Sequence, residues 1–473
     1  MISIRAAAPL LLLVLSGCVT GPDHVAPDMA LPQKFSEGSK KSDGDVTMTA
    51  WWTAFNDRKL NTLVDQGISQ NLDVLQALER INSAEANIVV SQAGALPALD
   101  VNASHTTSGS RGGFNGKTPT RQESAGGASI SWLLDLFGEY ARAKESAVAS
   151  LESAYAAADV AKLTFLSSVA SSYIDARFYQ ERIRIARANL GSRRETLDLT
   201  KLQLEAGAAS RLDVVQSEGL VNSTIADLPA LETSYRQAVN RIATLLGVPA
   251  SSLTNELEKG SGQPVARVKA VAGVPADLIR NRPDIRQAER ELAAATADIG
   301  VAEAQLYPSI SLGGSISPSY ISTKGANGSL TSWSFGPSLT LPIFDGGRLR
   351  ANVDIAESGA RVQYLAWKST VLTAVEEVEN AMTALNRDGQ IVNAQRQTVR
   401  SYQEALTLST ASYKDGASSL LDVLDAQRSV TTAQVSLAAA IQRAAQDYVS
   451  LSVAIGAGYN TSNWQASAPA AVN

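Results

Sequence analysis

The stretch GASSLLDVLDAQRS at residues 416–429 repeats a motif that the chain has already used once. The earlier copy, GAASRLDVVQSEGL, occupies residues 207–220, 209 positions upstream, and keeps Gly, Ala, Ser, Leu, Asp and Val in register. A glycine followed by S-x-x-D is typical of a helix end, a tight turn and a capped helix start. The two copies therefore predict equivalent helical hairpins, and they differ where Gln216 is replaced by Asp425.

A second pair of segments extends the repeat to most of the chain. NLDVLQALERINSAEANIVVSQAGALP at 71–97 aligns with RPDIRQAERELAAATADIGVAEAQLYP at 282–308, and nine of 27 positions are identical. Self-similarity at a fixed offset indicates a duplicated architecture. We therefore expect two halves of about 210 residues, joined by the connector 248–281, which is rich in Pro, Gly and Ser.

Each half also contains a predicted pair of β-strands. Apolar residues alternate with serine, glycine or threonine at 309–317 and 332–341, and more weakly at 99–103 and 130–134. Strands of about ten residues with one apolar face and one small polar face are typical of a transmembrane β-barrel. A two-sheet sandwich would alternate in the same way, but very long helices between the strands are incompatible with it.

Four strands are too few to close a barrel in lipid, where every backbone amide needs a hydrogen-bond partner. The chain must therefore oligomerise if the strands span a membrane. Two copies would give eight strands and a bore filled by side chains, whereas three copies would give twelve strands and room for water.

The long helices are predicted from two stretches without proline, 139–206 and 348–415. Each can form one helix of roughly 68 residues, on the order of 100 Å long. Near the turn, Leu190, Leu197 and Leu204 recur every seven residues, which indicates that neighbouring helices wind around one another. The rest of each stretch is rich in Ala and Ser with narrow apolar seams, a pattern that favours a ring of helices over a solid core.

The two turns carry the same backbone signals. Gly207 and Gly416 lie where a helix ends and the backbone favours positive φ. The acids of the capping boxes that follow, Asp213 and Asp422, are expected to start the returning helix at the positive end of its dipole. Asp425 lies one turn beyond, on the same face as Asp422. It is either a solvated surface acid or, if several chains surround an axis, one member of an acidic ring.

The N-terminus resembles a secretory signal. Arg5 precedes the apolar run 6–15, and Leu-Ser-Gly-Cys follows with Cys18, the only cysteine of the 473 residues. The pattern resembles a bacterial lipoprotein box, so Cys18 is the expected lipidation site; the alternative is an ordinary signal peptide with an incidental cysteine. Beyond the signal, no run of eighteen apolar residues predicts a membrane-spanning helix.

Composition and motifs argue against several function classes. The chain is 45% hydrophobic and 18% charged with net charge −5, unlike a disordered protein or a nucleic-acid binder. His24 and His105 have no partners at metal-ligand spacing, and no nucleophile elbow, P-loop or zinc motif is present. Only four methionines occur, which gives no thioether ladder for soft metal ions. We expect no enzyme activity, cofactor or bound metal.

An ordered set of segments carries a family resemblance. After the lipobox the segments are GPDHVAPDMALPQKF (21–35), WWTAFNDRKLNTLV (51–64), VPADLIRNRPDIRQAERELAAATADIGVAEAQLYPSI (274–310), LPIFDGGRLRANV (341–353) and LLDVLDAQRS (420–429). Together they resemble the outer membrane factor family of TolC and OprM type, within its lipoprotein branch. The resemblance implies a mixed α+β membrane protein: a homotrimer whose twelve-stranded β-barrel, four strands per chain, continues into a periplasmic barrel of twelve helices.

The resemblance and the repeat together predict ten segments. They are the lipoprotein signal peptide 1–17, the lipidated N-terminal belt 18–56, the first α-barrel helix 57–97, the first β-hairpin 98–136, the first long helical hairpin 137–247, the belt between the repeats 248–281, the second α-barrel helix 282–308, the second β-hairpin 309–344, the second long helical hairpin 345–456 and the C-terminal belt tail 457–473.

The resemblance also implies roles for the residues of the turns. The tips that would contact a periplasmic adaptor protein are Gly207, Ala208, Ser210, Asp213, Gly416, Ala417 and Ser419. The periplasmic gate would comprise Leu421, Asp422, Asp425, Arg428 and Tyr413. Some relatives carry a basic residue just after the tip glycine, whereas Ala417 and Ser418 are neutral here.

The implied function is the outer membrane channel of a tripartite efflux system of RND type. It would be a passive, gated exit duct in the outer membrane, reaching through the periplasm to an adaptor and, through it, to an inner-membrane pump. Drugs or other small solutes would pass without being chemically altered. Two alternatives stay open: a structural coiled-coil lipoprotein of the periplasm, and an exit duct of the same fold for type I protein secretion.

Overall fold

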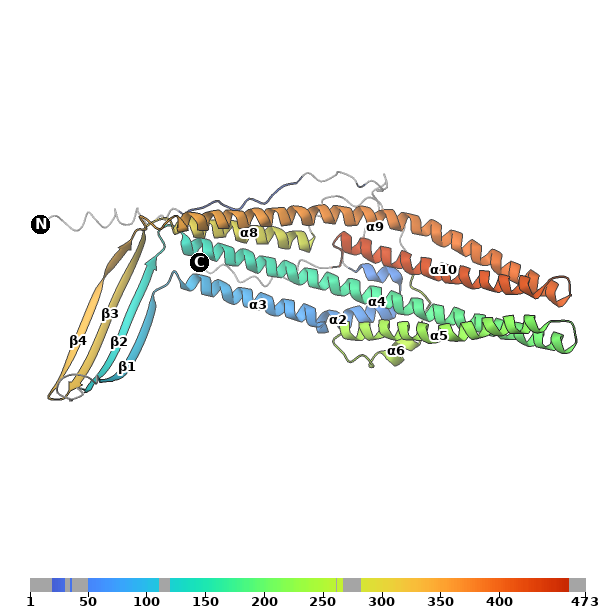
Figure 1. Cartoon of the computed structure of the whole chain (residues 1–473). Coiled ribbons are helices and arrows are strands. Elements are labelled where there is room, and N and C mark those ends of the chain that lie inside the picture. The colour runs from blue at the N-terminus through green and yellow to red at the C-terminus, as the bar shows by residue number, and fades with distance from the viewer. Residues whose placement is uncertain are drawn as a thin grey trace. The chain divides into compact units, whose positions relative to one another are not determined.

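The computed structural model describes residues 19–29, 35, 50–109, 120–260, 262–266 and 282–458 (Figure 1). The elements in chain order are η2 (Trp51–Phe55), α2 (Arg58–Gln70), α3 (Leu72–Ala93), β1 (Ala98–Gly109), β2 (Thr120–Leu134), α4 (Glu139–Glu205), α5 (Arg211–Leu245), α6 (Thr254–Glu258), α8 (Pro283–Ala304), β3 (Ser309–Thr323), β4 (Ala326–Thr340), α9 (Arg348–Lys414) and α10 (Leu420–Ala454). Cys18 lies outside the described residues.

The repeat predicted from the sequence is present in the structure. Helices α4 and α9 have 67 residues each, and α5 and α10 have 35 residues each. Corresponding helices begin 209 positions apart, at Glu139 and Arg348 and again at Arg211 and Leu420. The two proline-free stretches therefore form single helices, as predicted, because nothing in their sequence removes a backbone donor before the glycine turn.

The chain divides into two compact units that do not follow the two repeats. The first unit comprises Met1–Asp28, Arg80–Ala154 and Gln287–Lys368, and the second comprises Met29–Glu79, Tyr155–Arg286 and Ser369–Asn473. Each unit therefore contains equivalent parts of both repeats. The strands belong to the first unit and the helical turns to the second.

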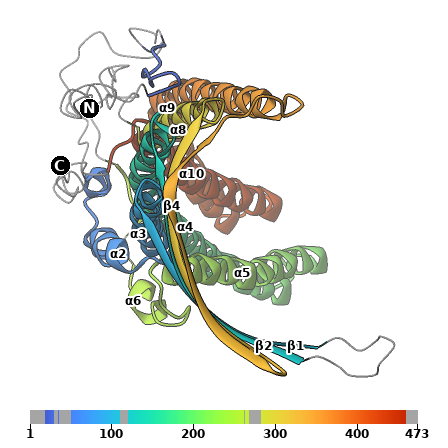
Figure 2. The same cartoon turned by 90° about the vertical axis from the view of Figure 1, so that its left-hand side faces the viewer.

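The first unit contains one antiparallel sheet in the order β1-β2-β3-β4, drawn as a curved ribbon in Figure 2. The register includes the pairs Ala98↔Ser131, Leu134↔Ile310 and Ser309↔Thr340. Strands β2, β3 and β4 have 15 residues each, longer than the expected ten, because pairing continues into the polar ends of the hairpins where no apolar alternation exists. Side-chain alternation alone therefore underestimates the length of the strands.

Among the described residues, β1 and β4 are the edges of the sheet, and neither pairs with a further strand. Pro337, which is unusual in a strand, lies in β4 opposite Leu312. An edge strand tolerates proline because one side of its backbone has no ladder to complete within the chain. Apolar side chains on these edge strands are highly exposed, among them Val101 at 79% and Trp333 at 77%. The single chain thus presents an incomplete sheet with an uncovered apolar surface.

An N-terminal strap, residues 19–28, is held against α4 and α8 in the first unit. Arg142, 3% exposed, donates hydrogen bonds to the carbonyls of Thr20 at 2.9 Å and Gly21 at 3.0 Å and pairs with Asp23 at 2.8 Å. A Cβ on Gly21 would lie 2.4 Å from the Cα of Gly300, so only glycine permits this approach. The strap leaves little backbone freedom directly after the expected lipidation site.

The core of the second unit joins η2 to α10. Trp51, 1% exposed, packs edge-on against Tyr448 of α10, whose hydroxyl donates to the Trp51 carbonyl at 3.1 Å. Arg282 is also buried; it pairs with Glu377 at 2.8 Å and donates to the Ala454 carbonyl at 2.7 Å. These contacts fix segments before α2 and before α8 onto the long helices.

Within the described residues, no helix is both long enough and apolar enough to cross a membrane.

Candidate functional site

The two helical turns, α4–α5 and α9–α10, have the same backbone geometry. Gly207 has φ +76° and Gly416 has φ +72°. In the first turn the Ala208 N–H donates to the Gln203 carbonyl at 2.7 Å, and in the second the Ala417 N–H donates to the Ser412 carbonyl at 2.8 Å. Together with the glycine N–H bonds, these are Schellman closures, which require a left-handed residue at the helix end. The positive φ predicted for Gly207 and Gly416 at the helix ends is therefore confirmed.

Each turn is followed by a reciprocal cap. The Ser210 N–H donates to Asp213 Oδ2 at 2.8 Å, and the Asp213 N–H donates to the Ser210 hydroxyl at 3.2 Å. In the second turn, Asp422 Oδ2 accepts from the Ser419 N–H at 3.0 Å and from its hydroxyl at 2.8 Å. Asp422, which the resemblance places in the gate, therefore has a definite structural role at the start of α10.

The exposed face of α10 carries the remaining charged gate candidates. The side chains of Asp425 and Arg428 are 59% and 54% exposed and form an ion pair at 2.9 Å on successive turns of the helix. Leu421 is 53% exposed beside them. The charge of Asp425 is thus partly offset by its own chain, a feature that the spacing alone did not indicate.

Tyr413 lies on the other side of this region, in a buried cluster. Its ring packs with Leu420, Val423 and Leu424, and its hydroxyl donates to Oε1 of Gln203 at the end of α4. Leu421 and Asp425 face away, so the predicted gate set separates into an exposed group and a buried one. Tyr413 is therefore a link between the two hairpins of the same chain.

Two further polar links join the hairpins and were missed from the sequence. The Gln427 side-chain amide of α10 donates to the Thr196 hydroxyl of α4 at 2.8 Å. Arg193 of α4, 8% exposed, donates to the Leu220 carbonyl at 3.3 Å and contacts the Thr431 hydroxyl at 3.4 Å. Burial lowers the pKa of the Arg193 guanidinium. The available signal was an arginine inside the heptad seam of α4, between Leu190 and Leu197.

The seven expected adaptor-contacting residues all lie at the turns. The residues at the first turn are Gly207, Ala208, Ser210 and Asp213, and those at the second turn are Gly416, Ala417 and Ser419. All are exposed except Asp213, which is half-buried. Small side chains therefore cover both tips, and a partner could approach the backbone closely.

The two histidines have ordinary polar partners. His24 Nε2 lies 2.7 Å from Glu289 Oε1, and His105 Nδ1 lies 2.9 Å from the Ser124 hydroxyl. Among the described residues, no three His, Cys, Asp or Glu side chains are grouped as metal ligands. The turns therefore consist of packed helices with charged side chains exposed on their surface.

Comparison with known proteins identifies what the chain is similar to. A family model described as outer membrane efflux protein matches residues 63–248 and 274–457. Nodulation protein T of Rhizobium leguminosarum bv. viciae is 58% identical over 97% of this chain and 94% of its own length. The pyoverdine export outer membrane protein OpmQ of Pseudomonas aeruginosa is 31% identical over 95% of this chain and 96% of its own. The structure of the outer-membrane channel OprN superposes with a TM-score of 0.82 at 31% identity, over 93% of this chain and 99% of that one.

Proposed function

The chain belongs to the outer membrane efflux protein family, and we propose on that basis that three copies form a passive, gated exit duct served by a periplasmic adaptor and an inner-membrane pump. The resemblance found in the sequence is confirmed by the family match and by the likeness to OprN. The chain is therefore an outer membrane efflux channel and not an enzyme. We propose further that the chain forms a trimer, that its periplasmic end is gated and that its pump is of RND type.

The observation that carries the proposal is the incomplete sheet. In the part of the chain that the structure describes, no strand pairs with the outer side of β1 or of β4, and apolar side chains of both strands are exposed. In lipid, such edges must be paired by further strands. Three copies supply twelve strands and a bore wide enough for water, whereas two copies supply eight and a bore filled by side chains. Because a conducting duct needs a bore that holds water, we propose three copies and not two.

The closed state would be held by the links between hairpins. The hydrogen bonds of Tyr413 to Gln203, Gln427 to Thr196 and Arg193 to Thr431 join the α4–α5 hairpin to the α9–α10 hairpin. Around a threefold axis, Asp425 and Leu421 would recur three times near the tip. Opening would then require the hairpins to separate, which breaks these links and moves the ring of charges outward.

An adaptor would open this gate by selection between two states. A partner shifts such an equilibrium only by binding the open state more tightly than the closed one. The exposed tips, with Ala208 and Ala417 beside the glycines, offer two equivalent contact points per chain, or six per trimer. We propose an RND-type pump and small solutes or drugs as cargo, as the resemblance to the lipoprotein branch implies; the relative OpmQ is named for the export of pyoverdine.

The test is electrical recording from the purified lipoprotein in a planar bilayer. We expect discrete, cation-preferring conductance steps, which would be small at rest if the proposed gate closes the tips. Co-purification after cross-linking in cells should return a trimer with an adaptor protein. A preparation that stays monomeric and never conducts, even after the links between hairpins are removed, would contradict the duct; recovery with a protein-secretion partner would instead favour type I secretion.

A further inference from the structure

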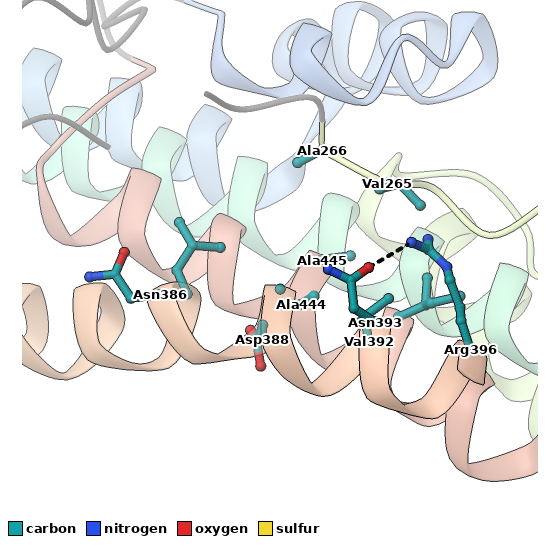
Figure 3. A pocket seen from close by; sticks show the side chains of 12 residues that line it. Val265, Ala266, Asn386, Asp388, Val392, Asn393, Arg396, Ala444 and Ala445 are labelled. Carbon is teal, nitrogen blue, oxygen red and sulfur yellow. Dashed lines mark hydrogen bonds between the residues drawn. The ribbon is translucent and has the colours of Figure 1, made fainter. Parts of the chain in front are cut away.

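The second unit contains α5, α10 and the ends of α4 and α9 that lead to the turns, side by side in the order α5, α4, α10, α9 (Figure 1, Figure 2). The inner helices α4 and α10 have a neighbour on both sides. Of the outer helices, α5 packs on α4 through Val214 and Leu197, and α9 packs on α10 where Val392 and Ala445 line a pocket of about 360 Å³ (Figure 3). Within this group of four helices, one face of α5 and one face of α9 therefore have no neighbour.

The contact between α4 and α10, which we call the inner seam, joins the two hairpins of one chain. The Asn189 amide of α4 donates to Oε1 of Gln434 at 3.3 Å, and the contact of Arg193 with α10 lies one turn further along. Nearer the turns, Leu199 of α4 packs on the apolar cluster of α10 that contains Leu424. All five side chains are buried or half-buried. The inner seam is thus polar along most of its length and apolar close to the turns.

The repeat gives each residue of the inner seam an equivalent on an outer helix. A shift of 209 positions converts α4 into α9 and α10 into α5. The equivalents of Asn189, Arg193 and Leu199 on α9 are, in this order, Thr398, Tyr402 and Leu408. The equivalents of Gln434 and Leu424 on α5 are Ile225 and Val215. The two outer faces therefore correspond to the two sides of the inner seam.

Four of these five outer residues are large apolar side chains that the single chain leaves exposed. Leu408 is 62% exposed, Val215 47%, Ile225 43% and Tyr402 42%. Removing such side chains from water is favourable. Exposed apolar residues at positions whose equivalents are packed indicate that a neighbour covers them in the assembled protein.

A closed ring of hairpins supplies that neighbour. Three copies contain six hairpins, and six seams are needed to close a ring of six. Three of them are the inner seams, and each of the other three must join α9 of one copy to α5 of the next. Because the repeats are equivalent, we expect the contact between copies to follow the register of the inner seam.

We propose that a second copy of the chain covers this surface, and that α9 of one copy packs on α5 of the next through an apolar outer seam. Leu408 lies against Val215 of the partner subunit, and Thr398 with the Tyr402 ring lies against Ile225 of the partner subunit. This inference rests on the trimer proposed above, and it adds the residues and the register of the contact between chains.

The two kinds of seam respond differently when the gate opens. The hydrogen bonds of the inner seam have fixed directions and distances, so they break when the hairpins of a chain separate. Apolar packing is non-directional, so neighbouring copies can shift against each other and stay in contact. The inner seam therefore switches, while the outer seam holds the trimer together in both states.

The test is cross-linking of the full-length lipoprotein in membranes with a short reagent that joins two thiols. Cys18 is the only native cysteine and the expected lipidation site, so the introduced cysteines supply the reactive thiols. The double variant Val215→Cys with Leu408→Cys should give covalent trimers on a denaturing gel, because each chain is joined to both neighbours. Ile225→Cys with Thr398→Cys should do the same. The outer seam is the only contact in which each pair meets.

Two matched pairs serve as controls. Gln216→Cys with Thr407→Cys uses adjoining, exposed positions on the same two helices, turned by about 100° along the helix, and should leave the chain monomeric on the gel. Asn189→Cys with Gln434→Cys spans the inner seam, so it should cross-link within one chain and change its mobility without forming covalent oligomers.

Amine-specific cross-linking of wild type separates this proposal from the duct itself. If wild type gives covalent trimers but the outer-seam pairs give no more of them than the control pair of Gln216 and Thr407, the outer seam is wrong and the duct stands. Wild type that stays monomeric would overturn both. Thiol cross-links to a different protein in place of a second copy would also overturn the outer seam. In Tyr413→Phe the yield from the outer-seam pairs should be unchanged, and a loss of yield would contradict a seam that persists on opening.

Discussion

Removing the Tyr413 hydroxyl should open the proposed gate. Tyr413→Phe keeps the ring in its cluster with Leu420, Val423 and Leu424 but deletes the hydrogen bond to Gln203. A partly buried hydrogen bond of this kind contributes about 1 kcal/mol. If three chains open together, the closed state loses about 3 kcal/mol, which corresponds to an increase of about a hundredfold in the ratio of open to closed channels.

The assay is single-channel recording in planar bilayers, in which the fraction of time spent open is measured directly. Tyr402→Phe is the matched control, because Tyr402 lies on the same helix with its side chain 42% exposed. Gln203→Leu should reproduce the effect of Tyr413→Phe, and the double variant should add little, because both changes remove the same bond. An open fraction unchanged in Tyr413→Phe, or equal effects of the two tyrosine variants, would refute the gate assignment.

Three further changes test the gate, a buried acid of α9 and the first turn. Asp425→Ala should reduce cation preference and block by multivalent cations, since it leaves Arg428 without its partner; reversal potentials in a salt gradient would show this. Burial, together with the Asp447 carboxyl, raises the pKa of Asp388 to about 6, so ionisation lowers native stability as pH rises from about 4 to 7. Asp388→Asn should therefore be more stable than wild type at pH 8, by on the order of 1 kcal/mol, and equal to it near pH 4 in denaturant unfolding. Gly207→Ala should lower thermal stability by about 1 kcal/mol, because alanine disfavours positive φ.

The helical backbone could be predicted from the sequence because its signals are local. The long helices end within one residue of the proline-free stretches, and the glycine closures and serine caps follow from residues within a few positions of each turn. The strands were predicted less completely. Their apolar alternation fades toward the hairpin ends, whereas backbone pairing continues to Thr323 and Ala326.

The links between hairpins could not be predicted, because they depend on which helix faces which. Tyr413 and Gln203 are 210 positions apart, and Arg193 and Thr431 are 238 positions apart. Helical periodicity gives the face of each residue but not the partner across the seam. The same limit applies to Arg177, whose Nη1 donates to the Leu257 carbonyl of α6, 80 positions away, in a region that composition describes only as a connector.

The two repeats separate structural requirements from functional ones within a single chain. Glycine, serine and aspartate recur at both turns because the Schellman closure and the helix cap require them wherever a hairpin of this length turns. Arg177 and Asn386 occupy the same place in equivalent hairpins, so hairpin geometry alone does not require an arginine there. Arg177 instead serves its own repeat, because it donates to the Leu257 carbonyl of α6 at 3.2 Å and to the Tyr173 hydroxyl at 3.0 Å. Gln216 and Asp425 also occupy equivalent positions in the two repeats. Only the position on α10 carries an acid, and three copies around a threefold axis would place these acids in a ring.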